Sequence, residues 1–285
     1  MTGPAPADPV KPGLTNLQTR VISAIALAAV ALSVTWVGGV WFRLFCVVIG
    51  AAVFYEWATM AGAMSSLRQQ IGTWLLLGLV LLALALGFDA RFVFLGALGA
   101  AALVFIHAWA AGEGGALWLG LAYAAIPAAS LAFLRDADAA GLWAILFLFA
   151  VVWSTDILAY FVGRALGGPK LAPAISPGKT WSGAIGGAAA GTMAALAVGA
   201  LGASPISPGL IAAAGLVLSV LSQAGDLFES AVKRRFGVKD SGWLIPGHGG
   251  VMDRVDALAA AAVALYVVGA LAAGADMPAH GLFGQ

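Results

Sequence analysis

Long apolar runs alternate with short polar connections from residue 21 almost to the end of the chain. A helix needs about 20 mainly apolar residues to cross a bilayer, because the membrane offers its backbone no water to bind. The pattern therefore predicts an all-α, polytopic integral membrane protein with about nine transmembrane helices. The predicted spans are Val21–Trp36, Val40–Ala61, Ile71–Phe88, Phe92–Ala110, Ala116–Leu134, Leu142–Val162, Trp181–Leu201, Pro208–Phe228 and Val255–Ala273.

Composition agrees with the pattern. Hydrophobic residues make up 62% of the 285 residues and charged residues only 9%, whereas a soluble domain carries about 25% charge. The single cysteine, Cys46, lies in an apolar run, so no intramolecular disulfide can form. Nothing in the composition indicates nucleic-acid binding.

The basic residues predict an orientation, because cytoplasmic loops of membrane proteins are enriched in Lys and Arg. With the N-terminus inside, eleven of the 14 basic residues lie on the cytoplasmic side, and Arg43, Arg91 and Arg135 lie on or near the other side. This N-in, C-out arrangement is self-consistent. It also places both long polar loops, 163–180 and 229–253, on the cytoplasmic face.

The segment 222–256 holds much of the charge, between the last two apolar runs. Charge at the mouth of a membrane domain is costly to desolvate, so by default it indicates a functional site. Five of its polar residues follow helical spacing and would share one helix face: Ser222, Asp226, Glu229, Ser230 and Lys233. A flexible loop follows, in which backbone can approach a ligand closely: Gly247, His248, Gly249 and Gly250.

Carboxylates in this segment predict a metal site. Asp253 and Asp256 stand three residues apart at the start of the last run, so both project from one side of its first turn. Brought together with Asp226, they would repel each other strongly unless a cation lay between them. Oxygen ligands without a nearby Cys favour Mg²⁺. We therefore expect Asp226, Asp253 and Asp256 to hold one Mg²⁺ or a metal pair, with Asp156 as a weaker candidate.

Cations and hydroxyls near these carboxylates suggest phosphate binding. One group lies in the charged segment: Lys233, Arg234, Arg235, Lys239 and Arg254. The loop before the seventh run adds Lys170, Ser176, Lys179 and Thr180, which are suitable donors to phosphate oxygens. This loop is no Walker A motif, because Pro173 stands where that motif needs glycine. Carboxylates for metal beside cations for phosphate are typical of phosphoryl- or nucleotidyl-transfer sites.

The charged segment also resembles a family signature. Its matching residues are Ser230, Lys233, Arg234, Lys239, Asp240, the run 246–250, Asp253, Arg254 and Asp256. Together they are similar to the signature of the phosphatidate cytidylyltransferase (CDP-diacylglycerol synthase) family. The segments 175–181 and 156–164 and Glu56 after an aromatic pair also resemble the family. Two positions depart from the family pattern. The family often has Glu where this chain has Ser182, and it often has a small pair, Thr-Gly or Ser-Gly, where this chain has Ile157-Leu158.

The resemblance implies that the protein joins CTP to phosphatidate, releasing pyrophosphate and CDP-diacylglycerol, and that it requires magnesium. We assign catalysis to Asp226, Asp253, Asp256, Lys233 and Lys239. The predicted substrate-binding residues are Arg164, Lys170, Ser176, Lys179, Thr180, Ser222, Ser230, Arg234, Asp240, His248, Gly249, Gly250 and Arg254. CTP or dCTP, phosphatidate and membrane lipids are the expected partners, and the family resemblance suggests a homodimer.

These assignments predict how the chain is divided. Residues 1–16 hold four prolines and few apolar groups, and we expect a disordered cytoplasmic tail. N-terminal transmembrane helices would occupy 17–140, a C-terminal catalytic transmembrane region 141–275, and a short tail 276–285. The expected location is a bacterial cytoplasmic (inner) membrane, with the active site facing the cytoplasm.

Alternative interpretations accompany these assignments. Asp253 and Asp256 could simply favour a helix N-terminus, and the Lys233–Lys239 cluster could anchor on acidic head groups. Glu56 could be a buried structural partner or line the lipid cavity, and His107 and His280 receive no role.

The whole protein could instead be an ion-coupled transporter with a relay of Asp156, Asp226 and Asp256, although such a relay does not need dense basic loops. A nucleotide-using enzyme acting on another lipid phosphate or a polyprenol is a further alternative. A CDP-alcohol phosphotransferase fits less well. The carboxylates of that family lie four residues apart in a longer pattern that opens with Asp-Gly, whereas Asp253 and Asp256 lie three apart without that opening.

Overall fold

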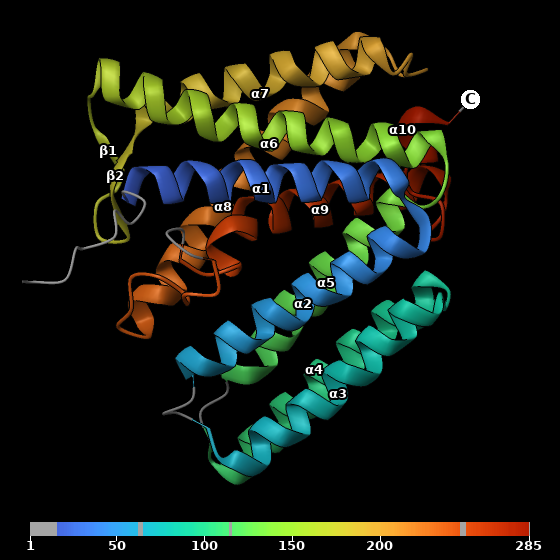
Figure 1. The fold of residues 1–285 in the computed structure, drawn as a ribbon, viewed down its shortest axis with the longest axis vertical. Coiled ribbons are helices and arrows are strands. Elements are labelled where there is room, and N and C mark those ends of the chain that lie inside the picture. The colour runs from blue at the N-terminus through green and yellow to red at the C-terminus, as the bar shows by residue number, and fades with distance from the viewer. Residues whose placement is uncertain (1–15, 62–64, 114–115, 246–248, 285) are drawn as a thin grey trace, which may run out of the picture.

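The computed structural model describes residues 16–61, 65–113, 116–245 and 249–284, with side chains from residue 21 onward. These residues form helices joined by short connections and one small hairpin (Figure 1). The elements are α1 (Asn16–Val37), α2 (Gly39–Ala61), α3 (Leu67–Leu86), α4 (Ala90–Ala111), α5 (Ala116–Arg135), α6 (Ala139–Leu166), β1 (Lys170–Ala172), β2 (Ser176–Thr180), α7 (Trp181–Leu201), α8 (Pro208–Arg235), α9 (Met252–Ala273) and α10 (His280–Phe283).

The prediction of a helical, polytopic membrane protein is confirmed. Among the described residues, the eight helices from α2 to α9 are long and apolar enough to cross a membrane, and α1 contributes a shorter apolar stretch, Val21–Val37. Large apolar side chains such as Trp109 and Leu271 are exposed on the outside of the bundle, as expected where lipid covers the surface. The predicted N-terminal tail lies almost wholly outside the described residues.

Helices pack in two groups that meet along α5. In the first, α2 lies against α5 and α3 against α4, around buried side chains such as Trp57 and Phe54. In the second, α6 packs along α7, α7 on α8, and α8 on α9, while α5 contacts both α6 and α9. Figure 1 shows the hairpin near one end of the second group, with α10 and the C-terminus at the other end.

Small residues allow the close contact between α6 and α7. Gly183, Gly187 and Gly191 are all buried in α7, and a methyl group at Gly187 would lie 2.7 Å from the Thr155 carbonyl oxygen of α6. Nearby, the buried hydroxyls of Thr155 and Ser219 share a hydrogen bond of 2.7 Å between α6 and α8. Small residues and interhelical hydroxyl bonds are common where membrane helices pack, which agrees with a packing role for the glycine stripe.

Two helices, α6 and α8, continue well into the predicted polar loops, which corrects where both loops begin. α6 runs to Leu166 and α8 to Arg235, each 28 residues or about 42 Å long, against a hydrocarbon core of about 30 Å. The loop predicted at 229–253 therefore begins as two further turns of α8. The loop predicted at 163–180 begins as the last turn of α6 and ends in the antiparallel hairpin, with Lys170 opposite Thr180.

The opposite end of the bundle also differs from expectation. Arg135, which was expected on or near the non-cytoplasmic side, is 3% exposed and donates hydrogen bonds to the carbonyl oxygens of Thr35 and Trp36 at the end of α1. The predicted tail 276–285 contains α10, whose Leu282 and Phe283 are buried. His280 therefore has a structural partner after all, since its Nε2 lies 2.5 Å from Asp138 Oδ2.

Asp138 itself begins α6 by accepting a hydrogen bond from the Gly141 amide. Burial opposes ionisation of this carboxyl group, but the bonds from Gly141 and His280 outweigh it and keep the pKa of Asp138 below its ordinary value. This pairing fixes the C-terminal segment to the start of α6, far along the helix from the charged residues discussed next.

Candidate active site

A cavity of about 820 Å³ opens among α6, the hairpin, α7, α8 and α9. Every described residue that lines it belongs to the range 156–256, so the second helix group forms the site. Twelve of the predicted site residues line it: Asp156, Arg164, Lys170, Ser176, Lys179, Thr180, Asp226, Lys233, Asp240, Asp253, Arg254 and Asp256. Residues from both polar loops thus meet at one cavity, as the orientation argument required.

Other predicted residues lie outside the cavity lining. Ser222 is buried within α8 and donates to the Ser219 carbonyl oxygen, Arg234 donates to the Val238 carbonyl oxygen, and Lys239 is exposed. Ser230 reaches the site indirectly, through a long 3.4 Å hydrogen bond to Asp226. Gly249 and Gly250 shape the loop before α9, and His248 lies outside the described residues.

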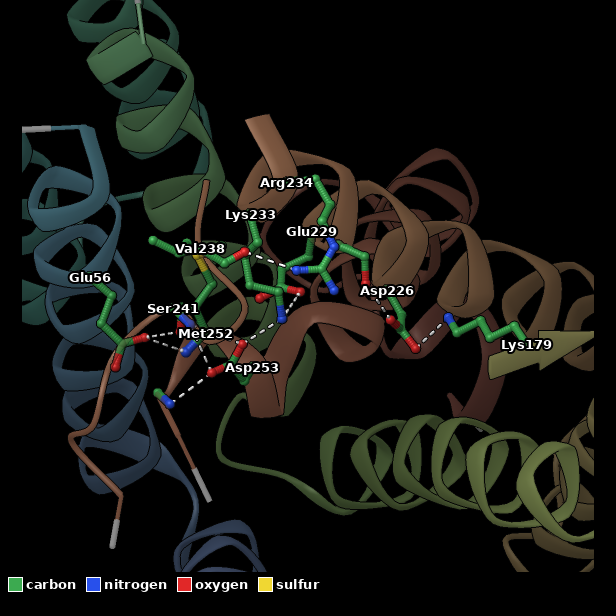
Figure 2. A network of polar contacts seen from close by, with 12 residues as sticks. Glu56, Lys179, Asp226, Glu229, Lys233, Arg234, Val238, Ser241, Met252 and Asp253 are labelled. Carbon is green, nitrogen blue, oxygen red and sulfur yellow. Dashed lines mark hydrogen bonds and ion pairs between the residues drawn. The ribbon is translucent and has the colours of Figure 1, made fainter. Parts of the chain in front are cut away.

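Lys233 is the centre of a buried charge cluster. Its Nζ lies 2.7 Å from Glu229 Oε2 on the same helix and 2.6 Å from Asp253 Oδ1 on α9 (Figure 2). The Glu229 side chain is fully buried, and those of Asp253 and Lys233 are only 5% and 12% exposed. In the described part of the chain, neither Glu229 oxygen has a well-directed hydrogen bond. The ion pair with Lys233 therefore provides its main compensation.

Asp253 is occupied on both of its carboxylate oxygens. Besides Lys233, it accepts hydrogen bonds from the Ser241 amide at 3.0 Å and the Gly250 amide at 2.8 Å. Short contacts to a cation and to backbone amides are strong because one partner is ionised. In this geometry Asp253 connects α8, α9 and the loop between them, which favours a positioning role over direct metal coordination.

A second ion pair crosses the cavity from the hairpin. Lys179 Nζ lies 2.5 Å from Asp226 Oδ2, and both side chains are about one-third exposed, at 27% and 30%. Figure 2 shows Lys179 reaching from the hairpin strand toward α8. Asp156 on α6 and Asp256 on α9 line the same cavity as Asp226, and these three carboxylates are close enough to repel one another.

The carboxylate oxygens at the cavity fit a hard divalent cation in part. Among the described residues, no group of three or more Asp, Glu, His or Cys side chains is close enough to enclose a metal ion. Mg²⁺ does not need such a cage, because it usually takes one or two carboxylates and completes its shell with water and substrate phosphates. Asp226 and Asp256, on neighbouring helices with cations around them, are donors of that kind.

Several residues at the site were not predicted. Tyr160 and Gln223 line the cavity; Tyr160 accepts a hydrogen bond from Arg164, and Gln223 donates to the Ala184 carbonyl oxygen of α7. Helical spacing could have identified both, because Tyr160 is four residues after Asp156 and Gln223 three before Asp226. Of the two interpretations left open for Glu56, the structure supports the buried structural partner, because Glu56 accepts hydrogen bonds from the loop before α9.

We predict that Gly250→Ala disrupts the site. A methyl group there would overlap the Ser241 hydroxyl and the Glu56 carboxylate, and overpacking of this kind costs about 1–3 kcal/mol. We expect a lower melting temperature and a loss of turnover of about tenfold or more, as for residues that orient ligand groups. Gly209→Ala is the control, since open space surrounds Gly209. Unchanged turnover in Gly250→Ala would contradict the close packing.

Comparison with known proteins places these residues in a wider group. A model of the cytidylyltransferase family matches residues 18–272. The phosphatidate cytidylyltransferase of Brucella suis is 51% identical over 269 residues, covering 93% of this chain and 97% of that protein. The Brucella abortus (strain 2308) protein of the same name is 51% identical over 268 residues, with the same coverage. The phosphatidate cytidylyltransferase of Rickettsia bellii is 39% identical over 161 residues, covering 54% of this chain and 69% of that protein.

Proposed function

The chain belongs to the cytidylyltransferase family, and from this premise we propose that it is the enzyme that transfers the cytidylyl group of CTP to phosphatidate. The products are CDP-diacylglycerol and pyrophosphate. The observation that carries the proposal is the cavity itself, where carboxylates from three membrane helices meet cations from the hairpin and from α8 and α9. Nucleotidyl transfer between two anions needs that combination of charges.

The chemistry requires positioning more than proton transfer. A phosphate oxygen of phosphatidate attacks the α-phosphorus of CTP, and the bond from that phosphorus to the oxygen of the leaving pyrophosphate breaks. Phosphatidate is already an anion at neutral pH, so no strong base is needed to activate it. Cationic side chains such as Lys179, Arg164 and Lys170 would bind phosphate oxygens and reduce repulsion between the substrates.

We further propose that Asp226 and Asp256 hold Mg²⁺ together with substrate phosphates, with Asp156 as a third ligand or as a ligand of a second ion. Bound there, the cation would supply charge stabilisation at the phosphates. Asp253 acts beside this pair through Lys233 and the loop amides. Lys179, now paired with Asp226, would exchange this contact for a phosphate oxygen when substrate arrives.

The location and assembly follow as proposals from charge and family. The distribution of Lys and Arg supports an N-in, C-out orientation that puts the cavity on the cytoplasmic face of a bacterial inner membrane, where CTP is available. Phosphatidate would enter from the membrane, since α6, α8 and α9 are apolar enough to cross it and also line the cavity. A homodimer is proposed on the family resemblance alone.

The test of the function is a labelling experiment with the purified protein in lipid nanodiscs. With phosphatidate and Mg²⁺, CTP labelled at the α-phosphate should transfer its label to lipid, whereas label at the γ-phosphate should leave as pyrophosphate. Absence of lipid label from a folded protein would contradict the proposal. Ion flux in proteoliposomes without CTP would favour the transporter instead, and label on another lipid phosphate would redefine the substrate.

Lys170→Gln is expected to weaken nucleotide binding. Lys170 lines the cavity from β1, and in the part of the chain that the structure describes it forms no ion pair. Its charge is therefore available to the triphosphate. Loss of one exposed, charge-assisted contact should raise KM for CTP about tenfold and leave kcat within about twofold. The control is Arg235→Gln, which is exposed and outside the lining; a fall in kcat at constant KM would contradict this assignment.

A further inference from the structure

Glu56 is a buried carboxylate from the half of the protein that contributes nothing to the described lining of the cavity. It lies in α2 and is 1% exposed. Its Oε2 accepts hydrogen bonds from the Ser241 hydroxyl and the Met252 amide, and its Oε1 accepts one from the Val251 amide. All three bonds measure 2.8 Å. Figure 2 shows Glu56 on α2, facing the loop that leads into α9.

Two of these donors are the backbone amides at which α9 begins. The first amides of any helix have no acceptor within the helix, and Val251, at the N-cap position, provides no side-chain acceptor. Glu56 supplies that acceptor from another helix, with a negative charge that suits the positive end of the helix dipole. Just before the helix, the Gly250 amide donates a hydrogen bond to Asp253. Two carboxylates thus fix where α9 starts.

The same carboxylate is connected to the charge cluster through Ser241. The Ser241 hydroxyl donates to Glu56, while its amide donates to Asp253. Asp253 in turn pairs with Lys233, and Lys233 with Glu229. Movement at Glu56 would therefore shift both the loop and the first turn of α9, which carries Asp253 and Asp256.

We propose that Glu56 is a positioning residue for cytidylyl transfer, which holds the start of α9 and the 241–251 loop so that Asp253 and Asp256 face the cavity. It acts through these hydrogen bonds and does not touch substrate. This inference rests on the proposed function for its kinetic readout. The anchoring contacts themselves are tested independently of any activity.

The experiment compares Glu56→Gln with Arg135→Gln in the full chain in nanodiscs. Glutamine keeps the shape, but either orientation of its amide points an N–H at a backbone N–H that now donates to Glu56. Arg135→Gln is the matched control, because Arg135 is likewise a buried charge that holds backbone groups, at the other end of the bundle. We expect Glu56→Gln to lower kcat about 100-fold, with KM for CTP within about threefold. Arg135→Gln should lower only the melting temperature.

Hydrogen exchange supplies the readout that a general loss of stability would not produce. Amides of Ser241, Val251 and Met252 should exchange faster in Glu56→Gln and at the wild-type rate in Arg135→Gln. The proposal would be overturned by wild-type exchange rates at these three amides in Glu56→Gln, by an unchanged kcat in Glu56→Gln, or by equal kcat losses in the two variants. If wild-type protein makes no CDP-diacylglycerol, the proposed function fails, while the exchange result still decides the anchoring role.

Ser241→Ala provides a second test of the proposal in case Glu56→Gln does not fold. It removes one of the three hydrogen bonds to Glu56 and leaves both α9 amides bound. We expect a smaller loss of kcat, about threefold to tenfold, with faster exchange at residue 241. Wild-type kcat and exchange in Ser241→Ala would overturn the proposed connection from Glu56 to Asp253.

Discussion

Asp256→Asn is expected to reduce cytidylyl transfer about 1000-fold without unfolding the protein. The substitution keeps the size of the side chain and removes the negative charge that we assign to cation binding. Removal of one preorganised group that stabilises transition-state charge typically costs about 100- to 1000-fold, and we expect a metal ligand to lie at the upper end. Asp226→Asn should produce a similar loss, since both carboxylates line the cavity from neighbouring helices.

The measurement is the initial rate of lipid labelling across a magnesium titration. Asp89→Asn is the control for loss of a carboxylate, because Asp89 is 56% exposed in an ion pair with Arg91, away from the cavity. Direct titration of bound Mn²⁺ or Mg²⁺ on the folded variants gives a second readout. Near-normal rates at saturating magnesium in Asp226→Asn and Asp256→Asn would refute the metal assignment.

Lys233→Met is expected to destabilise the protein more than other substitutions in the site. It would leave Glu229 and Asp253 as buried carboxylates without their cation. Removing one partner of a buried ion pair costs about 3–5 kcal/mol, because the remaining charge stays desolvated. Turnover per folded molecule should also fall, since Asp253 would lose the contact that holds α9 against α8.

Thermal unfolding in nanodiscs checks this expectation, with two comparisons. Lys179→Met breaks a pair that is about one-third exposed and should lower the melting temperature much less. Glu229→Gln combined with Lys233→Met removes one of the uncompensated charges, so it should recover part of the stability but not the activity. A melting temperature for Lys233→Met equal to that of Lys179→Met would show that the cluster is not buried in the functional protein.

The predictions made from sequence succeeded where the signal was local. Run length and apolar content identify a membrane helix such as α4 because each helix satisfies its own backbone bonds. Helical spacing likewise placed Asp226 and Lys233 on one helix, and both line the cavity. Hydropathy alone missed the end of α8, because it falls at Glu229 although the helix continues to Arg235. A helix that leaves the membrane remains a helix while its amides stay bonded.

The sequence by itself determined the membrane class, the polar segments that build the site, and the family signature, since all three depend on residue types at short spacings. Only the tertiary structure decided what each carboxylate contacts. Asp253 is occupied by Lys233 and two amides, whereas Asp256 lines the cavity three residues later. Glu56 holds the start of α9 across 196 positions of sequence. Such roles depend on how packed helices bring distant donors to one oxygen atom, and no local pattern encodes that meeting.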